Sequence, residues 1–123
     1  MTWLRRRVGD RGVVTTVDAW LNRQLAGAFV TDAATASRTM LLDLGRSEWS
    51  EEACALFELE PSGQPVIVDC AAVVGETDAF GGSLPVTGLA VDQQAALFAE
   101  SCFSAGEAKC TYGTGAFILA NAG

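Results

Sequence analysis

One of the aspartates, Asp92, occupies a position at which catalytic and ligand-binding groups are often found. Asp92 follows an apolar run at 85–91, which predicts a buried strand, and it precedes a helical segment at 93–101. In open α/β sheets, ligands bind beyond the carboxyl ends of the strands, where helix starts present polar groups. Asp92 is therefore a candidate site residue. A structural role remains open, because aspartate is also a good N-cap for the helix that follows.

A glycine-rich turn is the second candidate. Gly113, Thr114 and Gly115 separate two segments of strand character, 108–112 and 116–120, which predicts a hairpin with a tight turn. Glycines let a backbone approach an anion closely, so the turn could cradle a phosphate group. The pattern is neither a dinucleotide fingerprint nor a P-loop. A plain hairpin turn explains the same residues.

Composition narrows the chemistry that these residues can do. The 123-residue chain contains no histidine, which excludes Ser-His-Asp and Cys-His catalysis and histidine-ligated zinc. Proton transfer must therefore use carboxylates. No two of the four cysteines have the C-x-x-C spacing of a zinc ribbon or redox centre, and we expect reduced, mostly buried thiols.

Charge and hydropathy each argue against one class of partner. The net charge is −7, and residues 47–123 carry one lysine against eleven carboxylates, so we expect no binding to nucleic acid. No apolar run approaches the ~20 residues that a membrane span requires, and we expect neither membrane insertion nor export. The arginines between residues 5 and 11 form either a contact surface or a solvated end.

The surrounding elements are predicted from periodicity and capping residues. Val17, Trp20, Leu21 and Leu25 predict an amphipathic helix at 16–26, with Gly27 as its C-cap. Other expected elements are a helix at 33–42 capped by Thr31 or Asp32, a helix at 51–57 capped by Ser50, an extended segment at 65–75 and a surface loop at 75–83.

Four strings occur in an order and spacing that resemble one enzyme family. They are TVDAWL (16–21), VTDAATASRTML (30–41), DQQAALF (92–98) and AKCTYGTGAF (108–117). Together they resemble the FGGY carbohydrate kinases from about Val13 onward. The SRTML and DQQAALF strings resemble the glycerol kinases of that family more than its xylulose or gluconate kinases.

The resemblance implies an α/β fold of the actin-like, ribonuclease-H-like class, of which this chain is a part. Residues 1–101 would form the later part of the N-terminal domain, and residues 102–123 the first hairpin of the C-terminal domain. The implied reaction is phosphoryl transfer from ATP, with Mg²⁺, to glycerol or a similar polyol. A cytoplasmic location is expected, and a homo-oligomer can form.

The resemblance also implies roles for individual residues. Asp92 would be the catalytic base and would hold Mg²⁺ through water. Asp92, Gln93 and Phe117 would bind substrate. Gly113, Thr114 and Gly115 would contact the phosphate groups of ATP. Val91 departs from the family, which usually has glycine there, and a β-branched residue resists positive φ.

The family's first phosphate loop, its Arg-Glu polyol clamp and its adenosine-binding part have no counterpart in this sequence. We therefore expect the chain by itself to be inactive. A second interpretation stays open, in which the chain is a non-catalytic interaction or regulatory module derived from such a kinase.

Overall fold

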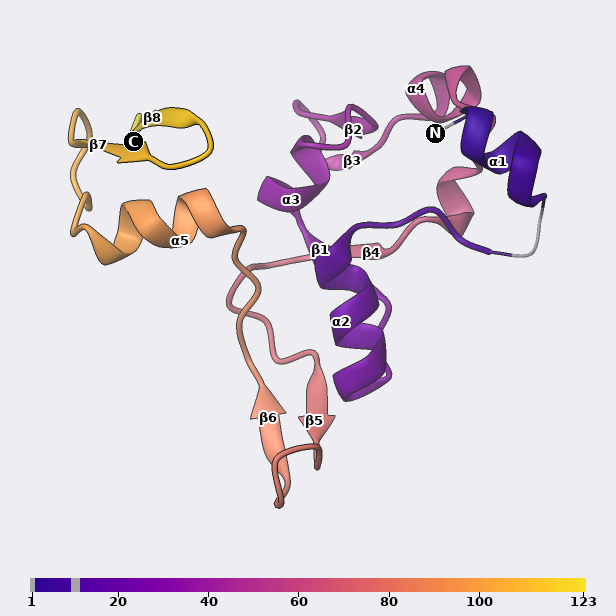
Figure 1. The fold of residues 1–123 in the computed structure, drawn as a ribbon, viewed down its shortest axis with the longest axis horizontal. Coiled ribbons are helices and arrows are strands. Elements are labelled where there is room, and N and C mark those ends of the chain that lie inside the picture. The colour runs from indigo at the N-terminus through magenta and orange to yellow at the C-terminus, as the bar shows by residue number, and fades with distance from the viewer. Residues whose placement is uncertain (1, 10–11) are drawn as a thin grey trace. The chain divides into compact units, whose positions relative to one another are not determined.

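The computed structural model describes residues 2–9 and 12–123, which form two compact units, one ending at Leu89 and one spanning Ala90–Gly123 (Figure 1). Each unit is described by itself. Both contain helices and strands, which confirms the predicted α/β class. None of the described helices is long and apolar enough to cross a membrane.

The first unit is built from short elements. Its helices are α1 (Thr2–Val8), α2 (Val17–Ala26), α3 (Ala33–Ser37), α4 (Glu51–Leu56) and the 3₁₀ turn η1 (Pro61–Gly63). Its strands are β1 (Val30–Asp32), β2 (Leu42–Asp43), β3 (Glu48–Trp49), β4 (Val66–Val68), β5 (Gly75–Thr77) and β6 (Leu84–Val86). β1 pairs in parallel with β4, whereas β2 with β3 and β5 with β6 form antiparallel pairs.

Local capping signals were predicted correctly in this unit. Gly27 ends α2 in the left-handed region, at φ +69°, and its N–H donates to the carbonyl of Arg23. The Ser50 hydroxyl accepts from the N–H of Ala53 at 3.2 Å, which caps α4. At the start of α3, the Asp32 carboxylate accepts from the N–H of Thr35 at 3.1 Å.

The helix predicted at 33–42 is too long. α3 ends at Ser37, because the N–H groups of Arg38 and Thr39 donate to carbonyls three residues back, at 3.0 Å each, in tighter turns than an α-helix. Met40 then adopts φ +64°, which no α-helix allows. The chain leaves the helix and turns Leu41 into the core, so that Leu42 begins β2.

The buried strand predicted at 85–91 is also wrong. Only Leu84–Val86 is extended and paired, as β6 against β5, and Leu84 and Pro85 are exposed. Proline cannot donate to a ladder, which suits an edge strand rather than a buried one. The loop expected at 75–83 begins with strand β5, and residues 87–91 have no regular structure.

The core of the first unit is small. Leu41, Cys54 and Leu59 are buried against one another, with Val14, Trp49, Ala53 and Phe57 packed around them. The expected apolar face of α2 is not covered by the residues that the structure describes: Trp20 is 54% exposed and Val17 74%. The buried residues of α2 are Ala19 and Asn22 instead. Amphipathic spacing predicted the helix, but not what lies against it.

The basic N-terminal segment forms α1, and one of its arginines reaches another helix end. Arg6 donates two hydrogen bonds to the carboxylate of Glu58, one of them at 3.2 Å. These bonds hold the pKa of Glu58 below its ordinary value. Both side chains are largely exposed, so the pair adds little stability. Arg11, the last arginine of that cluster, lies outside the described residues.

The thiols differ in exposure more than the sequence predicted. Cys54 is fully buried, whereas Cys70 and Cys110 are exposed, so the expectation of mostly buried thiols is wrong. Burial raises the pKa of the Cys54 thiol. Because the thiolate is the nucleophile, Cys54 should be the least reactive of the three.

We expect iodoacetamide at pH 8 to alkylate Cys54 at least about tenfold more slowly than Cys70 or Cys110, because its thiol is covered and stays protonated. Peptide mass spectrometry over time measures the three rates. The chain in urea is the control, in which the rates should converge. Equal rates for Cys54 and Cys70 in native buffer would contradict the packing described above.

The second unit is a helix followed by a hairpin. α5 (Asp92–Ala99) precedes β7 (Ala108–Tyr112) and β8 (Ala116–Ala120), which pair antiparallel with Ala108 opposite Ala120. Phe98 and Phe103 meet edge to face with ring centroids 5.1 Å apart. The hairpin predicted from the Gly-Thr-Gly turn is confirmed, and so is the helix, which begins one residue earlier than expected.

Candidate functional site

Asp92 is the first residue of α5 and not its N-cap. Val91 occupies the cap position, with φ −71° and ψ 146°, and it makes no side-chain capping bond. The Asp92 carboxylate is exposed and accepts from the N–H of Gln93 at 2.8 Å. It therefore lies at the N-terminal end of α5, where the backbone N–H groups of the first turn are directed.

Val91 fits its position without strain. Its φ of −71° lies in the ordinary extended region, so the positive φ that a β-branched residue would resist is not required here. The backbone of this chain therefore does not require a glycine at position 91.

The predicted phosphate turn connects β7 to β8. The N–H of Gly113 donates to the carbonyl of Gly115 at 2.9 Å, which closes the turn, and Thr114 is exposed at its tip. A Cβ on Gly115 would lie 2.9 Å from a ring atom of Phe117. Glycine at this position thus allows the Phe117 ring, 48% exposed, to lie against the turn.

A buried lysine joins the hairpin to the helix. Lys109, on β7, is 5% exposed, and its ammonium donates to the side-chain oxygen of Gln93 at 2.6 Å and to the hydroxyl of Thr111 at 2.7 Å. The side-chain nitrogen of Gln93 lies 3.5 Å from the Asp92 carboxylate. Asp92, Gln93 and Lys109 therefore form one connected polar group within the second unit.

Lys109 is the site residue that sequence reasoning missed. Residues 109 and 111 lie on the same face of a strand, because successive side chains alternate. A lysine and a threonine on one face of an otherwise apolar hairpin were a signal that this face meets polar groups. Which groups it meets depends on how the hairpin packs against α5, and spacing alone does not give that.

Asp92 is a single carboxylate and by itself does not form a protein-only metal site. The described residues contain no group of three or more cysteine, aspartate or glutamate side chains that could hold a metal. Mg²⁺ is commonly held by one or two carboxylates together with substrate phosphates, and Asp92 supplies one such carboxylate.

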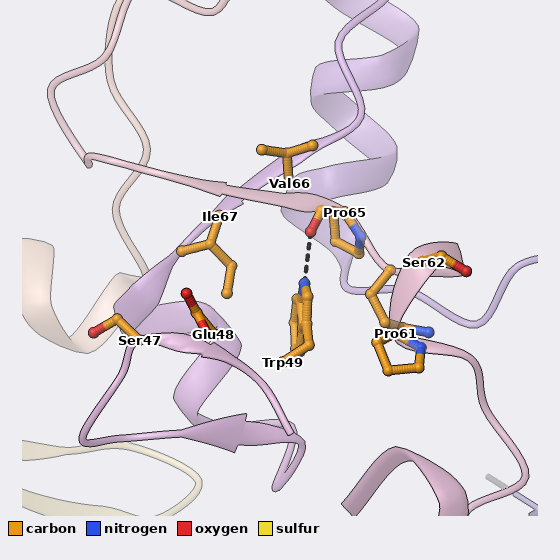
Figure 2. A pocket seen from close by; sticks show the side chains of 9 residues that line it. Ser47, Glu48, Trp49, Pro61, Ser62, Pro65, Val66 and Ile67 are labelled. Carbon is orange, nitrogen blue, oxygen red and sulfur yellow. Dashed lines mark hydrogen bonds between the residues drawn. The ribbon is translucent and has the colours of Figure 1, made fainter. Parts of the chain in front are cut away.

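The first unit has a hollow that does not contain the predicted site residues. It measures about 370 Å³ and is lined by residues of β3, η1 and β4. Figure 2 shows Trp49 in its wall, with the indole N–H donating to the carbonyl of Pro65 at 2.7 Å. Glu48 is the one charged residue that lines it, so the hollow brings no set of catalytic groups together.

Comparison with known proteins decides the family. The model of the N-terminal domain of the FGGY family of carbohydrate kinases matches residues 2–99. The chain belongs to the FGGY family of carbohydrate kinases. It is 47% identical over 124 residues to a glycerol kinase of Bordetella parapertussis, with 96% of this chain and 24% of that protein covered. With a glycerol kinase of Myxococcus xanthus it is 43% identical over 136 residues, covering 100% of this chain and 27% of the other.

Solved structures agree with this FGGY assignment. A xylulose kinase from Brucella ovis superposes with a TM-score of 0.79 at 26% identity, over 95% of this chain and 26% of that one. A ligand-bound xylulose kinase from Lactobacillus acidophilus gives a TM-score of 0.75 at 17% identity, which supports the fold alone. The predicted fold class is confirmed: the chain is part of a sugar-kinase domain of the actin-like class.

The FGGY chain spans about a quarter of the length of the curated relatives that it matches. It therefore corresponds to one segment of such a kinase. The roles predicted for Asp92, Gln93, Phe117 and the 113–115 turn stay predictions, although all of these residues lie together in the second unit.

Proposed function

We propose that the chain is the segment of an ATP-dependent glycerol kinase that supplies the catalytic carboxylate and the phosphate-contacting hairpin. One observation carries the proposal: identity of 43–47% to glycerol kinases extends over 96–100% of the chain. The reaction would transfer the γ-phosphoryl group of ATP to glycerol, giving glycerol 3-phosphate and ADP.

Asp92 is the proposed base of this reaction. Its exposed carboxylate accepts the proton of a glycerol hydroxyl while that oxygen forms a bond to the γ-phosphorus and the bond from phosphorus to the ADP oxygen breaks. Phosphoryl transfer mainly requires alignment and charge stabilisation, so a chain without histidine can contribute to it.

The other proposed contacts divide between substrate and nucleotide. The Gln93 amide and the Phe117 ring would hold glycerol, one by hydrogen bonding and one by packing against its carbons. Gly113, Thr114 and Gly115 would contact the phosphate groups of ATP, where a turn without side chains at two positions allows close approach. Mg²⁺ would neutralise charge on the phosphate oxygens, and Asp92 is the residue of this chain that would hold it.

We also propose a domain assignment and a location. Residues 1–101 would belong to the N-terminal domain of the kinase and residues 102–123 would open its C-terminal domain. The enzyme would be cytoplasmic, where ATP is available.

A chimera tests the function. Residues 1–123 replace the aligned segment of the Bordetella parapertussis glycerol kinase, and ADP formation is followed with and without glycerol. We expect glycerol-dependent turnover by the chimera, and none by the 123-residue chain alone, because that chain lacks most of a kinase's length. The unmodified Bordetella enzyme is the control.

A chimera that unfolds cooperatively but consumes no ATP with glycerol would overturn the proposal. Turnover by the 123-residue chain alone, lost in Asp92→Asn, would overturn the expectation that it is inactive.

The exposed apolar face of α2 also suits an interaction module. That alternative predicts a folded but inactive chimera.

A further inference from the structure

A contribution to folding stability does not explain why the ammonium of Lys109 is buried. Lys109 is the chain's only lysine, it is 5% exposed, and both of its hydrogen-bond partners, Gln93 and Thr111, are neutral. Removing an ammonium from water costs free energy that two neutral partners offset only in part. An apolar side chain of similar length would fill this space at a lower cost, so the charge points to a role beyond packing.

The hydrogen bonds of Lys109 fix the orientation of one amide. An ammonium only donates, so the group that Gln93 turns toward it must be the amide oxygen, 2.6 Å away. The amide nitrogen of Gln93 then faces the other way, and it lies 3.5 Å from the Asp92 carboxylate. The backbone N–H of Gln93 donates to the same carboxylate at 2.8 Å.

We propose that Lys109 is a positioning residue: it holds the oxygen of the Gln93 amide so that the amide N–H is presented beside Asp92 to a polyol hydroxyl, a role that rests on the function proposed above. Without Lys109 the amide can rotate and offer its oxygen instead. Lys109 itself is covered, so in this proposal it acts through Gln93 and not by contact with the substrate.

A double-mutant cycle in the chimera tests this role. We expect Lys109→Met to raise KM for glycerol about tenfold while kcat changes less than about threefold, because a hydrogen bond to a charged group is lost from the amide that binds substrate. Gln93→Leu should raise KM at least as much. The double variant should match Gln93→Leu within about twofold, because Lys109 acts through Gln93.

Cys110→Ala is the matched control, since Cys110 is the next residue on β7 and is exposed. It should leave KM and kcat within about twofold of the parent chimera, and thermal melts are recorded for every variant. If Lys109→Met changes only the melting temperature, or if its effect on KM adds fully to that of Gln93→Leu, the positioning role is wrong.

A second measurement needs no activity. In the ¹⁵N-labelled 123-residue chain, the side-chain amide resonances of Gln93 should shift on Lys109→Met and stay in place on Cys110→Ala. Unchanged Gln93 resonances in Lys109→Met would overturn the proposal. An inactive but folded parent chimera would instead refute the glycerol kinase function, so the two failures are distinguishable.

Discussion

Asp92→Asn is expected to lower the kcat of the chimera about 10²- to 10⁴-fold, which corresponds to roughly 3–5 kcal/mol of barrier. Asparagine keeps the shape of the side chain, and its amide oxygen can still accept from the N–H of Gln93. It cannot accept the proton of a substrate hydroxyl. Because the residue is exposed, the melting temperature should hardly change. Steady-state kinetics with glycerol and ATP, beside thermal melts, measure both effects.

Glu100→Gln is the control for loss of charge. Glu100 is exposed and lies at the other end of α5, so this change also removes one negative charge from the helix while leaving the proposed base in place. Its kcat should stay within about twofold of the parent chimera. An Asp92→Asn variant within about threefold of the parent kcat would refute the catalytic assignment and leave Asp92 a structural role only.

Leu41→Ala should unfold much of the first unit in the 123-residue chain. Leu41 is 2% exposed and, among the described residues, is buried against Cys54 and Leu59 at the centre of the apolar cluster. Truncating a buried leucine costs about 2–5 kcal/mol, because contacts are lost and a cavity remains. A core this small leaves little stability to lose. Urea denaturation followed by circular dichroism measures the change.

Leu44→Ala is the comparison for this core variant, because Leu44 is 75% exposed in the same unit. Its free energy of unfolding should change by less than about 0.5 kcal/mol. Similar stabilities for the Leu41 and Leu44 variants would mean that the cluster around Leu41 is not the core of this unit.

Elements that depend on neighbouring residues were predictable from the sequence. Gly27 ends α2, Ser50 caps α4 and the Gly-Thr-Gly turn closes a hairpin, and each signal acts within four residues of its effect. The errors arose at elements whose extent depends on a pairing partner that is distant in the sequence. Residues 87–91 read as a buried strand because they are apolar, but a strand needs a ladder, and β6 finds its partner β5 only at 84–86.

In the candidate site, too, some residues were predictable from the local sequence and one was not. The strings around Asp92 and the 113–115 turn were enough to single those residues out. Lys109 was not, because its significance comes from a contact with Gln93, sixteen residues earlier in the chain. The apolar face of α2 is a second example. The spacing of its apolar residues predicted the helix, but it did not predict which residues pack against Trp20.

The residues of the second unit are continuous in the sequence, which affects how they are inherited together. Asp92, Gln93, Lys109, the turn and Phe117 all lie within the continuous stretch Ala90–Gly123. A genetic exchange between related kinases that transfers this stretch as one piece will therefore carry Gln93 together with Lys109, the residue proposed to orient its amide. For laboratory evolution, a single oligonucleotide cassette covers every one of these positions, so paired changes at 93 and 109 can be sampled in one library.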